Sequence, residues 1–85
     1  MQVLYFTADW CGPCKMFKPV MQQVSQEMNV PVNYINVDYD ASFTQKYSVS
    51  SVPTIVIVAP DGTVSFRHSG AMSPQQLRET FSRFR

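Results

Sequence analysis

The chain has only two cysteines, and both lie in the stretch Trp10-Cys11-Gly12-Pro13-Cys14. Two thiols with two residues between them close a small disulfide ring, which points to dithiol–disulfide exchange. If a helix begins here, unpaired N–H groups and the positive end of the helix dipole stabilise a thiolate on the first sulfur. The spacing therefore predicts that Cys11 is the nucleophile. Cys14, about one turn further in and less exposed, is then the thiol that resolves a mixed disulfide.

Two other roles are open to a cysteine pair: a static disulfide or idle thiols, and a metal site. Cysteines this close in sequence brace very little of a chain. A structural zinc site needs about four ligands, and only His68 is available as a further nitrogen ligand. His68 shares strand parity with Val64 and Phe66, which predicts a structural residue at the end of an inward face. We therefore expect no metal ion and no cofactor other than the redox-active Cys11–Cys14 disulfide.

Composition and charge narrow the class of protein. The chain has 85 residues, 45% of them hydrophobic, and a formal net charge of +1. These values predict one domain, residues 1–85, with one core. Because no long basic run is present, we expect neither nucleic acid nor a membrane surface as a partner, and we expect a monomer that binds proteins. The first apolar run has no basic leader and breaks at Thr7 and Asp9, which predicts a cytoplasmic location.

Hydrophobic periodicity predicts the first half of an α/β fold. Residues 3–6 form a short apolar run, typical of a strand covered on both faces. Apolar residues then recur along one face of a helix that continues to residue 28, and Pro19 is expected to kink it. A second strand is predicted at residues 30–37. Asp38-Tyr39-Asp40 ends it and caps a short helix holding Phe43 and Tyr47, which implies a parallel crossover.

The second half predicts a hairpin and a closing helix. Residues 54–58 are β-branched and apolar at successive positions, which indicates a central strand. Pro60-Asp61-Gly62 turns the chain into a strand at residues 63–68, in which polar residues alternate with Val64 and Phe66. The last helix has a complete start signal, with Ser73 as N-cap, Pro74 in the first turn and Gln76 three residues after the cap. One sheet between helices accounts for every segment.

The chain closely resembles the thioredoxin family over nearly its whole length. The motifs that carry the resemblance are Trp10-Cys11-Gly12-Pro13-Cys14-Lys15 and the later Val52-Pro53-Thr54. Pro19, Asp61-Gly62 and Gly70 also fall where that family has them. The resemblance implies a minimal thioredoxin fold, a four-stranded mixed sheet flanked by helices in the order β-α-β-α-β-β-α, without the first strand and helix of full-length thioredoxins. It also implies a cis Val52–Pro53 bond against the two thiols. The residues it assigns to the active-site motif and the substrate-binding rim are Trp10, Gly12, Pro13, Val52, Pro53, Gly70 and Ala71.

The chain departs from the family pattern at two positions. Tyr5 stands where the family usually has a buried aspartate that helps to deprotonate the resolving thiol, and Tyr34 stands where a lysine commonly partners that aspartate. A phenol with a pKa near 10 is a poor base at neutral pH. We therefore expect that the charge pair was replaced as a unit and that water or a backbone group exchanges the proton of Cys14. Asp9 and Asp38 are expected to be solvated caps or turn formers.

The resemblance implies a thiol–disulfide oxidoreductase that reduces protein disulfides through Cys11 and Cys14 and is re-reduced by a thioredoxin reductase or a similar donor. Three alternatives remain open. One is glutaredoxin-like use of glutathione, although that family usually has Pro-Tyr between its cysteines and this chain has Gly12-Pro13. Another is an adaptor that binds a partner through its apolar rim, with incidental thiols. The third is an oxidase or isomerase of an oxidising compartment.

Overall fold

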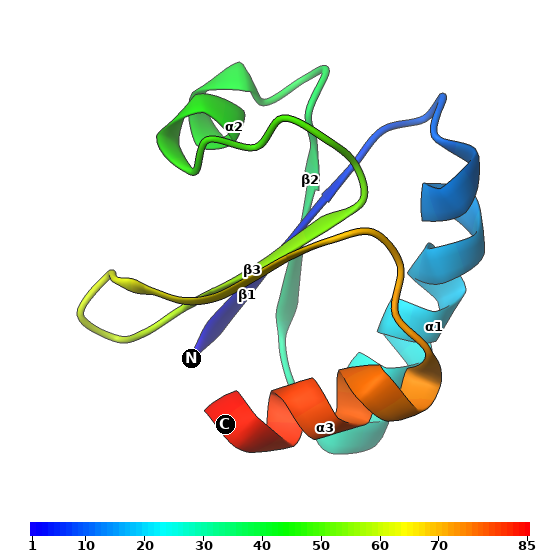
Figure 1. The fold of residues 1–85 in the computed structure, drawn as a ribbon, viewed down its shortest axis with the longest axis vertical. Coiled ribbons are helices and arrows are strands. Elements are labelled where there is room, and N and C mark those ends of the chain that lie inside the picture. Colours follow the sequence, from blue (N-terminus) through cyan, green and yellow to red (C-terminus); the bar gives the residue numbers. More distant parts are fainter.

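A single four-stranded sheet with helices on both faces forms the molecule, described here for residues 1–85 by a computed structural model (Figure 1). The strand order is β2-β1-β3-β4, with β1 and β2 parallel and the other neighbours antiparallel. This arrangement confirms the predicted mixed sheet and the predicted order of elements. Along the chain the elements are β1 (Gln2–Thr7), α1 (Gly12–Met28), β2 (Val32–Asn36), α2 (Ala41–Lys46), β3 (Thr54–Val58), β4 (Val64–Ser69) and α3 (Pro74–Phe84).

The two central strands divide the core into two layers. In Figure 1, α1 and α3 lie on one side of the sheet and α2 lies on the other. Side chains of a strand alternate between its two faces, so Val3 and Tyr5 of β1 join the cluster under α1 and α3, whereas Leu4 and Phe6 join the cluster near α2. Both faces are therefore covered, which is why β1 and β3 are apolar at successive positions.

Helix α1 starts and ends with recognisable signals. Cys11 is its N-cap, and Pro13 lies in the first turn, where the missing N–H costs no helical hydrogen bond. Asn29 ends the helix in the left-handed region, with φ of 55°, and its backbone N–H bonds back to the last turn. Pro19 lies inside a helix that continues to Met28, and the kink expected there stays a prediction.

Helix α3 has the predicted capping box. Ser73 Oγ accepts the Gln76 N–H at 3.2 Å, and the Gln76 side chain accepts the Ser73 N–H at 3.0 Å. The helix buries Leu77 and Phe81 in the same cluster as the apolar face of α1. No helix of this protein has the length and apolar character that crossing a bilayer requires.

Two details differ from the sequence-based expectations. Strand β2 begins at Val32, not at residue 30, because the Val30 N–H completes the end of α1 by bonding to Ser25 O at 2.9 Å. Pro31, the next residue, has no N–H to donate. Val64 was expected on the inward face but is 45% exposed, and the pairing of β3 with β4 shifts register between Ile57 and Val58 beside it.

Candidate functional site

The two cysteines lie at the turn where β1 delivers the chain to α1. A disulfide bond joins them, with their Cα atoms 5.3 Å apart. Cys11 has extended backbone geometry as the N-cap of α1, and its Sγ accepts the Cys14 N–H at 3.1 Å. In the reduced protein a thiolate on Cys11 would face the same N–H group and the positive end of the helix dipole. The structure therefore places Cys11 where the sequence predicted it.

Apolar groups surround both sulfur-bearing side chains. Cys11 is 4% exposed and Cys14 is 1% exposed, which agrees with the predicted order. Ala8 completes this small cluster, and the half-buried side chains of Val37 and Val52 pack against it. Little solvent therefore reaches the disulfide from this side, and electrostatic effects on a thiolate are stronger here than in water.

Trp10 stands beside the cysteines and is fixed by a residue that sequence analysis did not assign to the site. The residue is 69% exposed, and its Nε1–H donates to Asp38 Oδ2 at 2.8 Å. Asp38 follows β2, and because β1 and β2 are parallel, their carboxyl ends meet at one edge of the sheet. Asp38 is exposed and lies in a turn, as expected, and its bond to the Trp10 ring is a role that the sequence did not predict. The predicted crossover was the signal that could have placed Asp38 near Trp10.

The residues of the expected substrate-binding rim, called the docking rim below, come from three loops. Trp10 and Val52 line one pocket with a volume of about 230 Å³. The Val52–Pro53 bond is cis, as the resemblance implied, and the Gly70 N–H donates to Pro53 O at 2.8 Å. Gly70 has φ of +100°, a conformation that glycine adopts without strain, and Ala71 follows it on the surface. The structure thus brings these residues together in two pairs. Trp10 and Val52 line the same pocket, and Gly70 is hydrogen-bonded to Pro53.

Tyr5 contacts the backbone of Cys14 through its hydroxyl. The Tyr5 O–H donates to the Cys14 carbonyl oxygen at 3.3 Å, and its ring packs edge-on against Tyr34 with centroids 5.6 Å apart. Burial raises the pKa of Tyr5 above its ordinary value of 10.0, and burial also raises the pKa of Tyr34. The two positions expected to have changed as a unit are therefore in contact. Tyr5 holds the first turn of α1 and stays protonated at neutral pH.

The other candidate groups have structural roles. His68 is half-buried and stacks parallel on Phe66, with ring centroids 6.4 Å apart. Asp9 accepts a hydrogen bond from the Asn36 side chain at 3.3 Å. No group of three or more histidine, cysteine, aspartate or glutamate side chains is placed to hold a metal ion.

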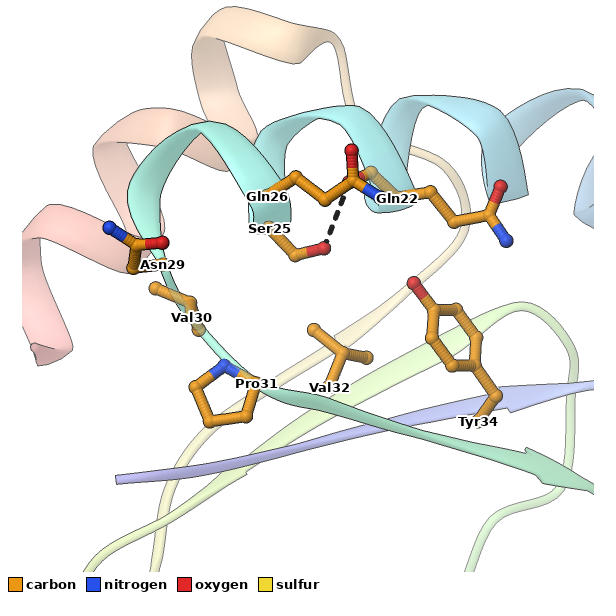
Figure 2. A pocket seen from close by; sticks show the side chains of 8 residues that line it. All are labelled: Gln22, Ser25, Gln26, Asn29, Val30, Pro31, Val32 and Tyr34. Atoms are coloured by element: carbon orange, nitrogen blue, oxygen red, sulfur yellow. Dashed lines mark hydrogen bonds between the residues drawn. The ribbon is translucent and has the colours of Figure 1, made fainter.

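The largest pocket of the molecule lies away from the dithiol. It has a volume of about 510 Å³ and lies between the C-terminal half of α1 and the edge strand β2 (Figure 2). Its polar groups are amides and hydroxyls, and no cysteine lines it. In Figure 2 the hydroxyl of Tyr34 points from β2 towards α1 at the end of this pocket. Because no cysteine lines it, the pocket is separate from the Cys11–Cys14 site.

Comparisons with known proteins agree on one family. The Thioredoxin family model matches residues 1–83. Thioredoxin of Bacillus subtilis is 37% identical over 76 residues, covering 87% of this chain and 72% of that protein. Thioredoxin of Pseudomonas aeruginosa is 36% identical over 74 residues, covering 85% and 68%. The crystal structure of Fasciola hepatica thioredoxin superposes with a TM-score of 0.88 at 37% identity, over 98% of this chain and 79% of that one.

Proposed function

Because this chain belongs to the thioredoxin family and is a thiol–disulfide oxidoreductase, we propose that its substrates are disulfide bonds in other proteins, which it reduces. The observation that carries this proposal is the position of Cys11, an N-cap whose sulfur accepts the Cys14 N–H beside the exposed Trp10. A nucleophilic thiolate is thereby stabilised next to an apolar surface that a folded substrate can cover.

The proposed cycle moves two electrons from the dithiol to the substrate. The Cys11 thiolate attacks one sulfur of a substrate disulfide, so that a Cys11–substrate bond forms and the other substrate sulfur leaves as a thiolate. The Cys14 thiolate then attacks Cys11 Sγ and displaces the second substrate sulfur. The product is the Cys11–Cys14 disulfide, the state in which the structure is described. A second dithiol system returns the two electrons.

The docking rim in this proposal consists of Trp10, Val52, Pro53, Gly70 and Ala71. An extended substrate segment pairs with the backbone of Val52, because Pro53 has no N–H of its own to offer. Trp10 covers one side of that segment, and its hydrogen bond to Asp38 keeps the ring in place. Gly12 and Pro13 shape the turn between the two thiols.

We further propose one domain over residues 1–85, acting as a monomer in the cytoplasm without a cofactor beyond its own disulfide. Dithiol systems keep protein thiols reduced in that compartment. Gly12-Pro13 between the cysteines favours a thioredoxin reductase over glutathione as the electron donor. The apolar rim alone would also suit an adaptor. An adaptor, however, needs neither the N-cap position of Cys11 nor the hydrogen bond that the Cys11 sulfur accepts from the Cys14 N–H.

Single cysteine variants test this proposal. With a disulfide-bonded protein as substrate and reduced dithiothreitol as donor, we expect Cys11→Ser to abolish turnover. Cys14→Ser should accumulate a mixed disulfide between Cys11 and the substrate, visible by non-reducing electrophoresis and mass spectrometry. Wild-type turnover by Cys11→Ser would overturn the mechanism. Full biological activity of the double variant Cys11→Ser/Cys14→Ser would favour the adaptor instead.

A further inference from the structure

A pocket separate from the one beside Trp10 reaches the resolving cysteine. It has a volume of about 420 Å³, and its wall includes Cys14 but not Cys11. The charged and polar side chains around it are those of Thr7, Asp9, Lys15, Lys18, Tyr34 and Asn36. Cys14 is 1% exposed, and this is the one pocket of the molecule that it lines.

Lys18 is the best-placed charge in this pocket. It lies four residues after Cys14 on α1, so the two side chains share one helix face. Its Nζ lies 5.6 Å from the centre of the Tyr34 ring, a cation–π contact that holds the amine beside the pocket. The only salt bridge in the structure joins Glu27 to Arg78, so Lys18 forms no salt bridge with a carboxylate.

The other titratable groups facing Cys14 do not replace Lys18. Tyr5 and Tyr34 are both protonated at neutral pH, because burial raises the pKa of each. Lys15 lines the same pocket but has no contact that fixes its amine. Asp9 also lines it, and its carboxylate accepts a hydrogen bond from Asn36. Two lysines against one aspartate leave the pocket with a net positive charge.

We propose that this pocket is the path by which Cys14 loses its proton, and that Lys18 is a positioning residue whose charge favours the Cys14 thiolate. Water in the pocket takes the proton of the Cys14 thiol. The thiolate then attacks Cys11 Sγ, the Cys11–substrate bond breaks, and the substrate sulfur leaves as a thiolate that is later protonated. The inference rests on the resolving role proposed for Cys14, and it assigns to Lys18 an electrostatic task that Tyr5 cannot perform as a neutral phenol.

The test measures ionisation of Cys14 without any substrate. In a Cys11→Ser background, Cys14 is the single thiol, and ultraviolet absorbance follows its thiolate as pH rises. The double variant Cys11→Ser/Cys14→Ser supplies the baseline, because tyrosines also ionise at alkaline pH. Added to the single-thiol background, Lys18→Met should move the titration midpoint upwards by about half a pH unit, a roughly threefold loss of thiolate at neutral pH. Lys18→Arg keeps the charge and should restore the midpoint.

Lys46→Met is the matched control. Lys46 makes a similar contact with a tyrosine, its Nζ lying 5.5 Å from the Tyr47 ring centre, but it lies on α2 and does not line the pocket. We expect it to leave the midpoint unchanged. An unchanged midpoint in Lys18→Met would overturn the inference, and so would an equal shift in Lys46→Met. A shift specific to Lys18 combined with no turnover of protein disulfides would support the inference and reject the proposed function.

Discussion

At the scale of single residues, the backbone of Cys14 is held from two sides. Its N–H donates to the sulfur of Cys11, and its carbonyl accepts from the hydroxyl of Tyr5. The first bond would stabilise a thiolate on Cys11, the proposed nucleophile, and the second holds the turn that carries Cys14, the proposed resolving thiol. In this chain Tyr5 therefore holds the backbone in place, at a position where the family usually has an aspartate that acts as a base.

Substitution of Tyr5 separates a structural role of its hydroxyl from a role in proton transfer at Cys14. We expect Tyr5→Phe to lower the free energy of unfolding by about 1 kcal/mol, because one buried hydrogen bond is lost. The rate of mixed-disulfide resolution at neutral pH should stay within twofold of wild type. Tyr5→Asp should speed resolution but lower stability further, because an unpaired buried carboxylate is costly. Urea unfolding and stopped-flow kinetics measure the two effects. A large loss of resolution rate in Tyr5→Phe would show that the hydroxyl takes part in proton transfer.

The raised pKa of Tyr5 also predicts a dependence of stability on pH. The unfolded chain releases the phenol proton near pH 10.0, whereas the folded protein retains it to higher pH. Between these two values the unfolded state binds fewer protons, so the free energy of unfolding falls as pH rises above about 10. Below that range Tyr5 contributes no slope. Urea unfolding of wild type and Tyr5→Phe at several alkaline pH values should therefore show their stabilities converging, and a constant difference would contradict the assignment.

If the hydrogen bond between Trp10 and Asp38 positions the indole for protein substrates, its loss should affect large substrates more than small ones. Asp38→Ala frees the indole, so kcat/KM for a protein disulfide should fall about threefold, in line with the loss of one charge-assisted hydrogen bond at an exposed site. Activity towards a small aromatic disulfide should not change. Asp38→Asn keeps an acceptor oxygen and should recover most of the loss. An equal fall with both substrates would mean that Asp38 acts on the thiols directly.

At the scale of elements, strong local signals predicted the strands and helices well. The apolar runs of β1 and β3 and the start signal at Ser73 lie within single short segments, and the structure confirms each. The predicted start of β2 was wrong because the Val30 N–H bonds back into α1. That bond depends on how the helix ends. The bond between Trp10 and Asp38 joins residues far apart in sequence. Such contacts depend on which strands become neighbours, and no local pattern encodes them.

The cap of α3 can be tested against a control in the same helix. Ser73→Ala removes the oxygen that accepts the Gln76 N–H, and the free energy of unfolding should fall by about 1 kcal/mol. Ser82 is exposed near the end of the helix and caps nothing, so Ser82→Ala should have little effect. Thermal or urea unfolding followed by circular dichroism compares the two. Similar losses in both variants would argue against a specific capping contribution.

At the scale of the whole molecule, two buried clusters of 10 and 5 residues stabilise the sheet, and the dithiol lies in a third cluster of 3 residues. Chains of this size are only marginally stable, at about 0.05 to 0.15 kcal/mol per residue. The large clusters under α1, α3 and α2 therefore carry stability, whereas the edge where β1 and β2 end carries the chemistry. Because the cysteines lie outside the two larger clusters, we expect the core to stay packed when the disulfide opens and closes.

The most direct test of the central claim is the redox equilibrium of the Cys11–Cys14 pair in defined dithiol buffers. Trp10 fluorescence follows the transition, and thiol trapping with mass spectrometry counts the electrons. A reversible two-electron transition with a midpoint below about −230 mV is predicted for a reductant of protein disulfides. A midpoint above about −180 mV would indicate an oxidant or isomerase instead. The absence of a reversible transition would contradict a redox function for this dithiol.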